Sequence, residues 1–267
     1  TAAVDPRAAL EAYVALVRRF PARVAILVAI ASLALLAYVG AAADTSTNPY
    51  DDDVAYYPFV KQLLQAGTLL DPFSFRRMST LGGQAFLHAL VALRLDVVQS
   101  NLFDRGLCVV IVVWLIGGAT RGSKKASFVY PALGAAFFLL LKNTSINSAS
   151  YYSGVVIFLA LYRSSAWIVR GSVRDHVVSA TPMILLGAAA CSLRQNYLVP
   201  VFAFHGLVVL ERFGFKRGTR LPFTKAVSLS FALIVLGLLP WLCVLFRSND
   251  TFLWPVMRGT FTQGAST

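Results

Sequence analysis

Charged residues are scarce in this sequence, and their scarcity excludes an ordinary soluble domain. Aspartate, glutamate, lysine and arginine make up 13% of the 267 residues, whereas 57% are hydrophobic. Soluble domains carry roughly 25% charged residues, so a soluble core of this composition would leave too few charges for its surface. A lipid bilayer suits such a chain better, because several of its apolar runs approach the roughly 20 residues that span a membrane.

Cysteine is also rare, which excludes a disulfide framework and a cysteine-based metal site. Cys108, Cys191 and Cys243 stand apart in apolar surroundings and share no metal-ligand spacing. We expect them to be buried, unreactive thiols. The chain lacks internal repeats as well, and its apolar runs are almost free of charge. Both features disfavour a transporter, which carries repeats and charges near the bilayer midplane.

Acidic residues are half as frequent as basic ones, 12 against 24, so the net charge is +12. A basic chain can bind nucleic acid. Here the basic residues occupy short loops between apolar runs, as the positive-inside rule requires. Nucleic acid is therefore not an expected partner.

The apolar runs predict an all-α integral membrane protein with about seven transmembrane helices. The predicted spans are residues 22–43, 102–120, 128–141, 151–169, 177–192, 198–210 and 226–246. The chain 1–267 then forms a single membrane domain, with an outer loop at 44–101, six spans within 102–246 and an outer tail at 247–267. With the N-terminus in the cytoplasm, 15 of the 24 basic residues but only four of the 12 acids lie on the cytoplasmic side, which supports this topology.

Two amphipathic segments interrupt the outer loop, and both are too short and too polar to span. The first runs from the aspartates at 51–53 to Gly67, its expected C-cap. The second covers 84–95, with Phe86 and Leu90 on its apolar face. Both fit helices that lie in the plane of the membrane interface.

Three adjacent carboxylates, Asp51, Asp52 and Asp53, open the first segment. One acid suffices to cap a helix and to complement its positive end, whereas three in a row repel one another. The cluster is therefore interpreted either as a helix start or as a functional site. The functional reading is a general base, a cation site, or both.

Four basic residues lie on the predicted outer side, although the positive-inside rule places most basic residues in the cytoplasm. They are Arg76, Arg77, Lys142 and Arg194. Snorkelling, headgroup contact or pairing with an acid would explain them. Capture of a phosphate is the alternative, because guanidinium groups bind phosphate bidentately. The lone His88 in the second amphipathic segment is interpreted as a polar-face or hydrogen-bonded residue.

The run Asp52-Asp53-Val54-Ala55-Tyr56 pairs two acids with a tyrosine three residues after the second. Together with the first span, the outer loop and the two interfacial helices, it resembles the GT-C superfamily of membrane glycosyltransferases. That superfamily includes the aminoarabinose lipid A transferases and the protein O-mannosyltransferases. The resemblance covers the whole chain in topology but only a short motif in sequence. Family members usually continue with further spans, so we expect a truncated homologue, a fragment of a longer chain, or a relative that has lost activity.

The resemblance implies sugar transfer from a polyprenyl-phosphate donor to a lipid, glycan or protein acceptor, on the outer face of a bacterial inner membrane. Asp52 would deprotonate the acceptor hydroxyl. Asp53 would orient it or help Asp52 hold a divalent cation such as Mg²⁺ or Mn²⁺. Asp51 and Tyr56 would contact the substrate. The four outer cations, Arg76, Arg77, Lys142 and Arg194, would stabilise the leaving phosphate.

The expected partners are thus membrane lipids and a polyprenyl-phosphate-linked sugar. A non-catalytic membrane subunit or scaffold of a larger complex is the alternative function. It needs no active site, and its partners would be other membrane subunits. A large outer cavity lined by Asp52 and the arginines would favour the enzyme.

Overall fold

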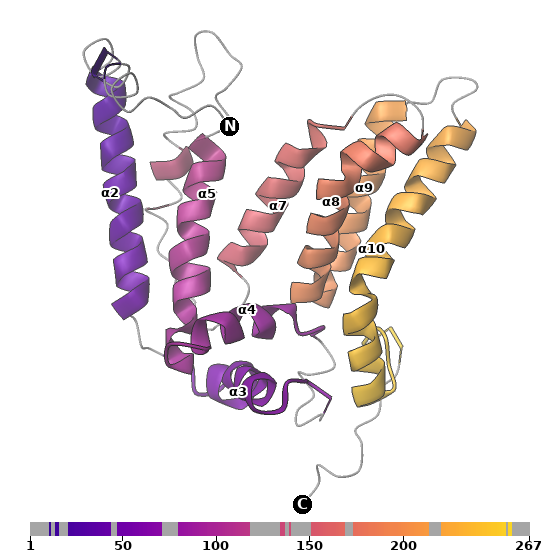
Figure 1. Ribbon diagram of the computed structural model, residues 1–267, viewed down its shortest axis with the longest axis horizontal. Coiled ribbons are helices and arrows are strands. Elements are labelled where there is room, and N and C mark those ends of the chain that lie inside the picture. Colours follow the sequence, from indigo (N-terminus) through magenta and orange to yellow (C-terminus); the bar gives the residue numbers. More distant parts are fainter. Residues whose placement is uncertain are drawn as a thin grey trace, which may run out of the picture.

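A computed structural model describes residues 11, 14–15, 21–43, 47–70, 80–117, 134–136, 139, 151–168, 173–213, 220–254 and 256–257. Over these residues the fold is helical and contains no strand. Its longer helices stand side by side as a bundle, and two short ones lie across one end (Figure 1). The helices of the bundle are α2 (Pro21–Ala43), α5 (Cys108–Gly117), α7 (Tyr152–Ser165), α8 (Val173–Leu193), α9 (Leu198–Phe213) and α10 (Arg220–Asn249).

Four helical stretches in the described part are long and apolar enough to cross a bilayer. They are Ala22–Ala43, Val97–Ile116, Arg174–Leu193 and Phe223–Asn249. Large apolar side chains on them point outward: Leu36 is 66% exposed, Leu185 63% and Leu236 60%. Such exposure would be costly in water and is favourable in lipid. The chain is therefore a helical membrane protein.

The predicted span 128–141 lies outside the described residues except at 134–136 and 139, which are helical. Ala135 is buried there and packs with Ile30 of α2 and Val113 of α5. Helices α7 and α9 have 14 and 16 residues and lie parallel to the long helices (Figure 1). The total of seven spans stays a prediction.

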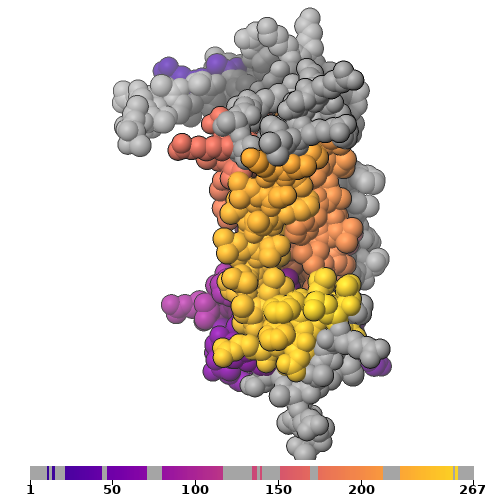
Figure 2. Space-filling view, turned by 90° about the vertical axis from the view of Figure 1, so that its right-hand side faces the viewer, coloured from indigo at the N-terminus to yellow at the C-terminus, as the bar shows by residue number. Residues whose placement is uncertain are grey.

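Helix α8 is the centre of the bundle, in contact with α7, α9 and α10. Met183 on α8, Leu161 on α7 and Leu238 on α10 are fully or almost fully buried in one core cluster. A buried histidine also joins α8 to α9, because the two ring nitrogens of His205 lie 2.9 Å from the Val201 carbonyl and 3.1 Å from the Met183 carbonyl. Helix α10 runs the length of one face of the molecule, and its end reaches the level of the interfacial helices (Figure 2).

The two segments predicted to lie in the interface are helical. They are α3 (Tyr57–Ala66), which follows a π-helical turn η1 (Asp52–Tyr56), and α4 (Gly83–Ala92). Both lie across the bundle end at which α2 finishes and α5 begins (Figure 1). Gly67 is the C-cap of α3 as predicted: its φ is +69°, and its N–H donates to the Leu63 carbonyl at 3.0 Å.

A carboxylate anchors this end of the bundle to α7. Asp104 lies in η4 (Leu102–Leu107), the π-helical turn that leads into α5, and is only 3% exposed. Its Oδ1 accepts from the backbone N–H of Ser153 at 2.8 Å and from the Ser153 hydroxyl at 2.7 Å, and its Oδ2 accepts from the N–H of Tyr152 at 3.1 Å. These bonds satisfy N–H groups that the start of a helix leaves without intrahelical partners.

Candidate functional site

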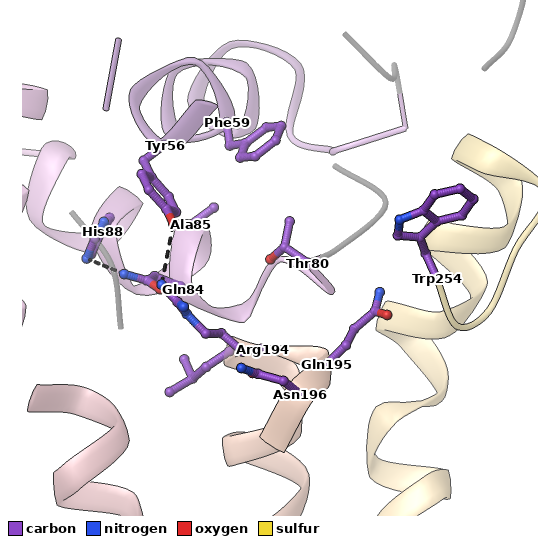
Figure 3. Close-up of a pocket in the computed structure, with 11 residues that line it drawn as sticks. Tyr56, Phe59, Thr80, Gln84, Ala85, His88, Arg194, Gln195, Asn196 and Trp254 are labelled. Carbon is purple, nitrogen blue, oxygen red and sulfur yellow. Dashed lines mark hydrogen bonds between the residues drawn. The ribbon is translucent and has the colours of Figure 1, made fainter. Parts of the chain in front are cut away.

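A cavity of about 490 Å³ lies where the interfacial helices meet the turn between α8 and α9 (Figure 3). Cavities of this size hold small ligands in other proteins. Its walls come from η1, α3 and α4, from the turn η6 (Gln195–Tyr197), and from the segment after α10. The lining residues are Tyr56, Phe59, Thr80, Gln84, Ala85, His88, Leu193, Arg194, Gln195, Asn196 and Trp254.

Arg194 projects into this cavity toward Tyr56. The chain leaves α8 at Arg194 in an extended conformation, with φ −150° and ψ 136°, before it turns into η6. Nη2 of Arg194 donates to the hydroxyl of Tyr56 at 3.4 Å (Figure 3). Two predicted substrate-binding residues, 138 positions apart in the sequence, thus meet in one cavity. A partly buried guanidinium beside a phenol is a suitable receptor for a phosphate oxygen.

Helix α4 turns its polar face inward. Gln84 and His88 line the cavity and are buried, whereas Phe86 and Leu90 on the other side of the helix are 46% and 49% exposed. This arrangement fits the expectation that α4 presents an apolar face to the membrane. The Gln84 amide nitrogen lies 3.5 Å from Nε2 of His88, at the long limit of a hydrogen bond. The polar face of α4 that carries His88 therefore faces the protein interior and the cavity.

Two glycines allow close packing at the start of α4, Gly82 against Leu69 and Trp241 and Gly83 against α8. Gly82 precedes the helix with φ +110°, a conformation that suits glycine. A Cβ on Gly83 would collide with the side chain of Ser192, near the end of α8. This close approach places the polar face of α4 opposite Arg194.

The segment after α10 closes another side of the cavity. The Thr251 hydroxyl donates to the Met257 carbonyl at 3.1 Å and accepts from the N–H of Leu253 at 3.3 Å. The Met257 N–H donates to the Leu253 carbonyl at 2.7 Å. These bonds fold the segment into a compact turn, which carries Trp254 to the cavity wall (Figure 3).

The aspartate cluster lies next to the cavity wall but does not line the cavity. Asp52 is fully buried, and its Oδ2 accepts from the N–H of Asn48 at 2.9 Å. Asp53 is exposed and Asp51 is partly buried, and Asp51 makes no side-chain cap to the turn that follows. No aspartate or glutamate occurs among the described residues that line the cavity.

A cation site at the cluster is not supported by its donor geometry. Within the described ranges, no group of three or more histidine, cysteine or acidic side chains comes together in a way that could hold a metal ion. Asp52 instead directs an oxygen at a backbone amide. The residues in place thus do not fit a divalent cation, and no chemical step is assigned to one. Arg76, Arg77 and Lys142 lie outside the described residues.

Sequence reasoning missed Trp254, Gln84 and Asn196 as site residues. Trp254 falls in the outer tail, where a single aromatic residue gives no periodic signal. Gln84 begins the predicted second amphipathic segment, and its polarity was the available clue. Asn196 lies two residues after Arg194, in the polar turn that had singled out the arginine.

No family model, no curated protein and no solved structure matches this chain.

Burial of His88 predicts a pH-dependent stability. Desolvation lowers the pKa of His88 from 6.5 to about 4, so between these two values the unfolded chain binds the proton that the folded chain rejects. Stability should therefore fall as the pH drops below 6.5, by about 1 kcal/mol between pH 7.5 and 5.5, and should stop falling below about pH 4. Thermal unfolding in detergent across this range measures it. The His88→Gln variant should lack that part of the slope, and an identical slope in both proteins would contradict the assignment.

Proposed function

We propose that this chain is a GT-C-like membrane glycosyltransferase that transfers a sugar from a polyprenyl-phosphate donor to a hydroxyl acceptor. The Arg194–Tyr56 contact inside the 490 Å³ cavity carries the proposal. It joins the tyrosine of the acid–acid–tyrosine motif to the basic residue expected at the lipid phosphate. The N-terminus is cytoplasmic in this proposal, and the cavity opens on the outer face of a bacterial inner membrane.

The position of the cavity supports a lipid-linked substrate. It lies at the end of the helix bundle, beside helices α3 and α4, which run across that end (Figure 1). A polyprenyl phosphate places its phosphate at this level of a bilayer while its tail stays in the hydrocarbon. Arg194 is partly buried, and a guanidinium in a partly desolvated site attracts an anion more strongly than one in bulk water.

The proposed reaction is a single displacement. The acceptor oxygen forms a bond to the anomeric carbon, its proton passes to the Asp52 carboxylate, and the bond between the anomeric carbon and the phosphate oxygen breaks. Because Asp52 is buried beside the cavity wall, this proton transfer requires the turn η1 to bring its carboxylate into contact with the bound acceptor. The electron pair of that bond leaves on polyprenyl phosphate, whose charge Arg194 stabilises. Asp53 and Asp51 lie on the same turn as Asp52 and assist it in this scheme. Arg76, Arg77 and Lys142 are proposed as further phosphate contacts.

One observation favours the alternative, a non-catalytic subunit that binds the same lipid. Asp52 is fully buried and its carboxylate accepts a hydrogen bond from the Asn48 N–H, so this carboxylate already has a structural role. A subunit of this kind would bind the lipid phosphate through Arg194 and would contribute no base. Binding and transfer must therefore be measured separately.

Arg194→Gln tests the phosphate site, which the transferase and the non-catalytic subunit share. Loss of a charged donor to phosphate costs about 1.5–3 kcal/mol, so we expect polyprenyl phosphate to bind the variant roughly 10- to 100-fold more weakly. Binding is measured by titration into nanodiscs of zwitterionic lipid that contain the purified protein. Arg247→Gln is the matched control, because Arg247 is exposed in the last turn of α10 and does not line the cavity. Equal affinity of Arg194→Gln and wild type would refute the phosphate site.

A further inference from the structure

Among the described residues that line the cavity, Arg194 is the one cation and the other polar side chains are uncharged. Apart from Arg194, the polar side chains of its described lining are amides, hydroxyls and an imidazole. Burial lowers the pKa of that imidazole, His88, to about 4 and so keeps it neutral at physiological pH. Arg194 is assigned to the phosphate, so the neutral side chains are left for the rest of the ligand.

Aromatic side chains occupy two parts of the wall. Phe59 comes from α3, and Trp254 comes from the turn after α10. Figure 3 shows the indole on the side of the cavity opposite His88, with Thr80 and Gln195 between them. An indole presents an electron-rich face, and the C–H bonds on one face of a sugar ring carry partial positive charge. A sugar therefore packs on such a face while its hydroxyls remain directed toward polar groups.

Amide groups lie within the same space to receive those hydroxyls. Asn196 is exposed and lines the cavity next to Arg194, and an amide both donates and accepts hydrogen bonds. Gln84 and His88 supply further neutral donors and acceptors on α4. Arg194 matches the phosphate of a phosphate-linked sugar, the indole matches its ring, and the amides match its hydroxyl groups.

We infer that the cavity takes the lipid-linked sugar with its ring packed on Trp254, its hydroxyls on the amides of Asn196 and Gln84, and its phosphate on Arg194. This inference rests on the proposed function and adds to it a specificity-determining residue for the sugar. It assigns the sugar ring to Trp254 and the phosphate to Arg194, so mutation of each residue tests one of the two contacts.

The test compares polyprenyl phosphate with polyprenyl-phosphate-glucose, both titrated into nanodiscs that contain the protein. For the wild type, the attached glucose should tighten binding about tenfold, the effect of one good aromatic contact. Trp254→Ala should lose this tenfold gain and bind polyprenyl phosphate as the wild type does, whereas Trp254→Phe should keep most of the gain. Trp167→Ala is the matched control, because Trp167 is 67% exposed and outside the cavity lining.

Each outcome bears on a different part of the inference. If Trp254→Ala weakens both lipids equally, or weakens neither, the ring is not on Trp254 and the inference fails while the phosphate site stands. If the wild type binds neither lipid, the proposed function fails and the inference falls with it. Trp254→Phe guards against a folding defect of the alanine variant.

Discussion

Asp52→Asn is expected to reduce sugar transfer at least about 100-fold, because general-base catalysis typically contributes 10²–10⁴-fold. Asparagine has nearly the same shape as aspartate but does not accept a proton at neutral pH. Its carbonyl oxygen retains an acceptor for the Asn48 N–H, which Asp52 Oδ2 accepts at 2.9 Å. The variant therefore separates the loss of a base from the loss of a structural contact. Transfer is measured with reconstituted protein, polyprenyl-phosphate-glucose and a hydroxyl acceptor.

Two comparisons make the Asp52 result decisive. Glu211→Gln removes a carboxylate in the same way near the far end of α9, on an exposed residue, and should leave transfer unchanged. Polyprenyl phosphate should bind Asp52→Asn as tightly as the wild type, because Asp52 does not line the cavity. Undiminished transfer by Asp52→Asn would rule out the base. Absence of transfer in the wild type, with intact lipid binding, would favour the non-catalytic subunit.

The helices were predictable from the sequence because hydrophobicity alone decides them. The runs at 22–43 and 226–246 correspond to α2 (Pro21–Ala43) and α10 (Arg220–Asn249), and 177–192 to α8 (Val173–Leu193). The ends shifted outward by up to six residues on α10. Helix α10 continues past the apolar run through the exposed basic residues Lys225 and Arg247, as expected for side chains long enough to reach a polar interface.

The burial of each acidic side chain was not predictable in the same way. Asp51, Asp52 and Asp53 look equivalent in the sequence, yet the π-helical turn leaves one partly buried, one fully buried and one exposed. Their rotation depends on how η1 and α3 dock on the bundle end, which is a tertiary property. Asp104 gave no local signal either, because its partners Tyr152 and Ser153 lie 48 and 49 residues away.

The pairing of Tyr56 with Arg194 could be anticipated only through the resemblance. No periodicity links residues 138 positions apart, whereas the GT-C resemblance implies that both contact the substrate. Trp254 lay beyond that resemblance, because the motif ends well before the tail. Residues that reach the cavity by a local turn, such as the one Thr251 holds, require coordinates to be found.

Asp104→Ala is expected to be strongly destabilising. It would leave two buried N–H groups and the Ser153 hydroxyl without the acceptor that they now share at 2.7–3.1 Å. Donors to a carboxylate are each worth about 1.5–3 kcal/mol, and an unsatisfied buried donor costs about 1–3 kcal/mol. We expect a net loss of about 3 kcal/mol, which lowers the apparent melting temperature by roughly 6–12 °C.

A thermal unfolding series in detergent tests the role of Asp104. Asp104→Asn keeps one acceptor oxygen and should lose about half as much stability as Asp104→Ala. Asp96→Ala is the matched control: Asp96 is exposed and its Oδ1 accepts from the Val98 N–H at 3.3 Å, so loss of this cap should cost about 1 kcal/mol. Because Asp104 fixes the start of α7 rather than the cavity, Asp104→Ala should still bind polyprenyl phosphate at low temperature. A melting temperature no lower than that of Asp96→Ala would show that α7 is held in place by its apolar contacts with α5 and α8, and not by this carboxylate.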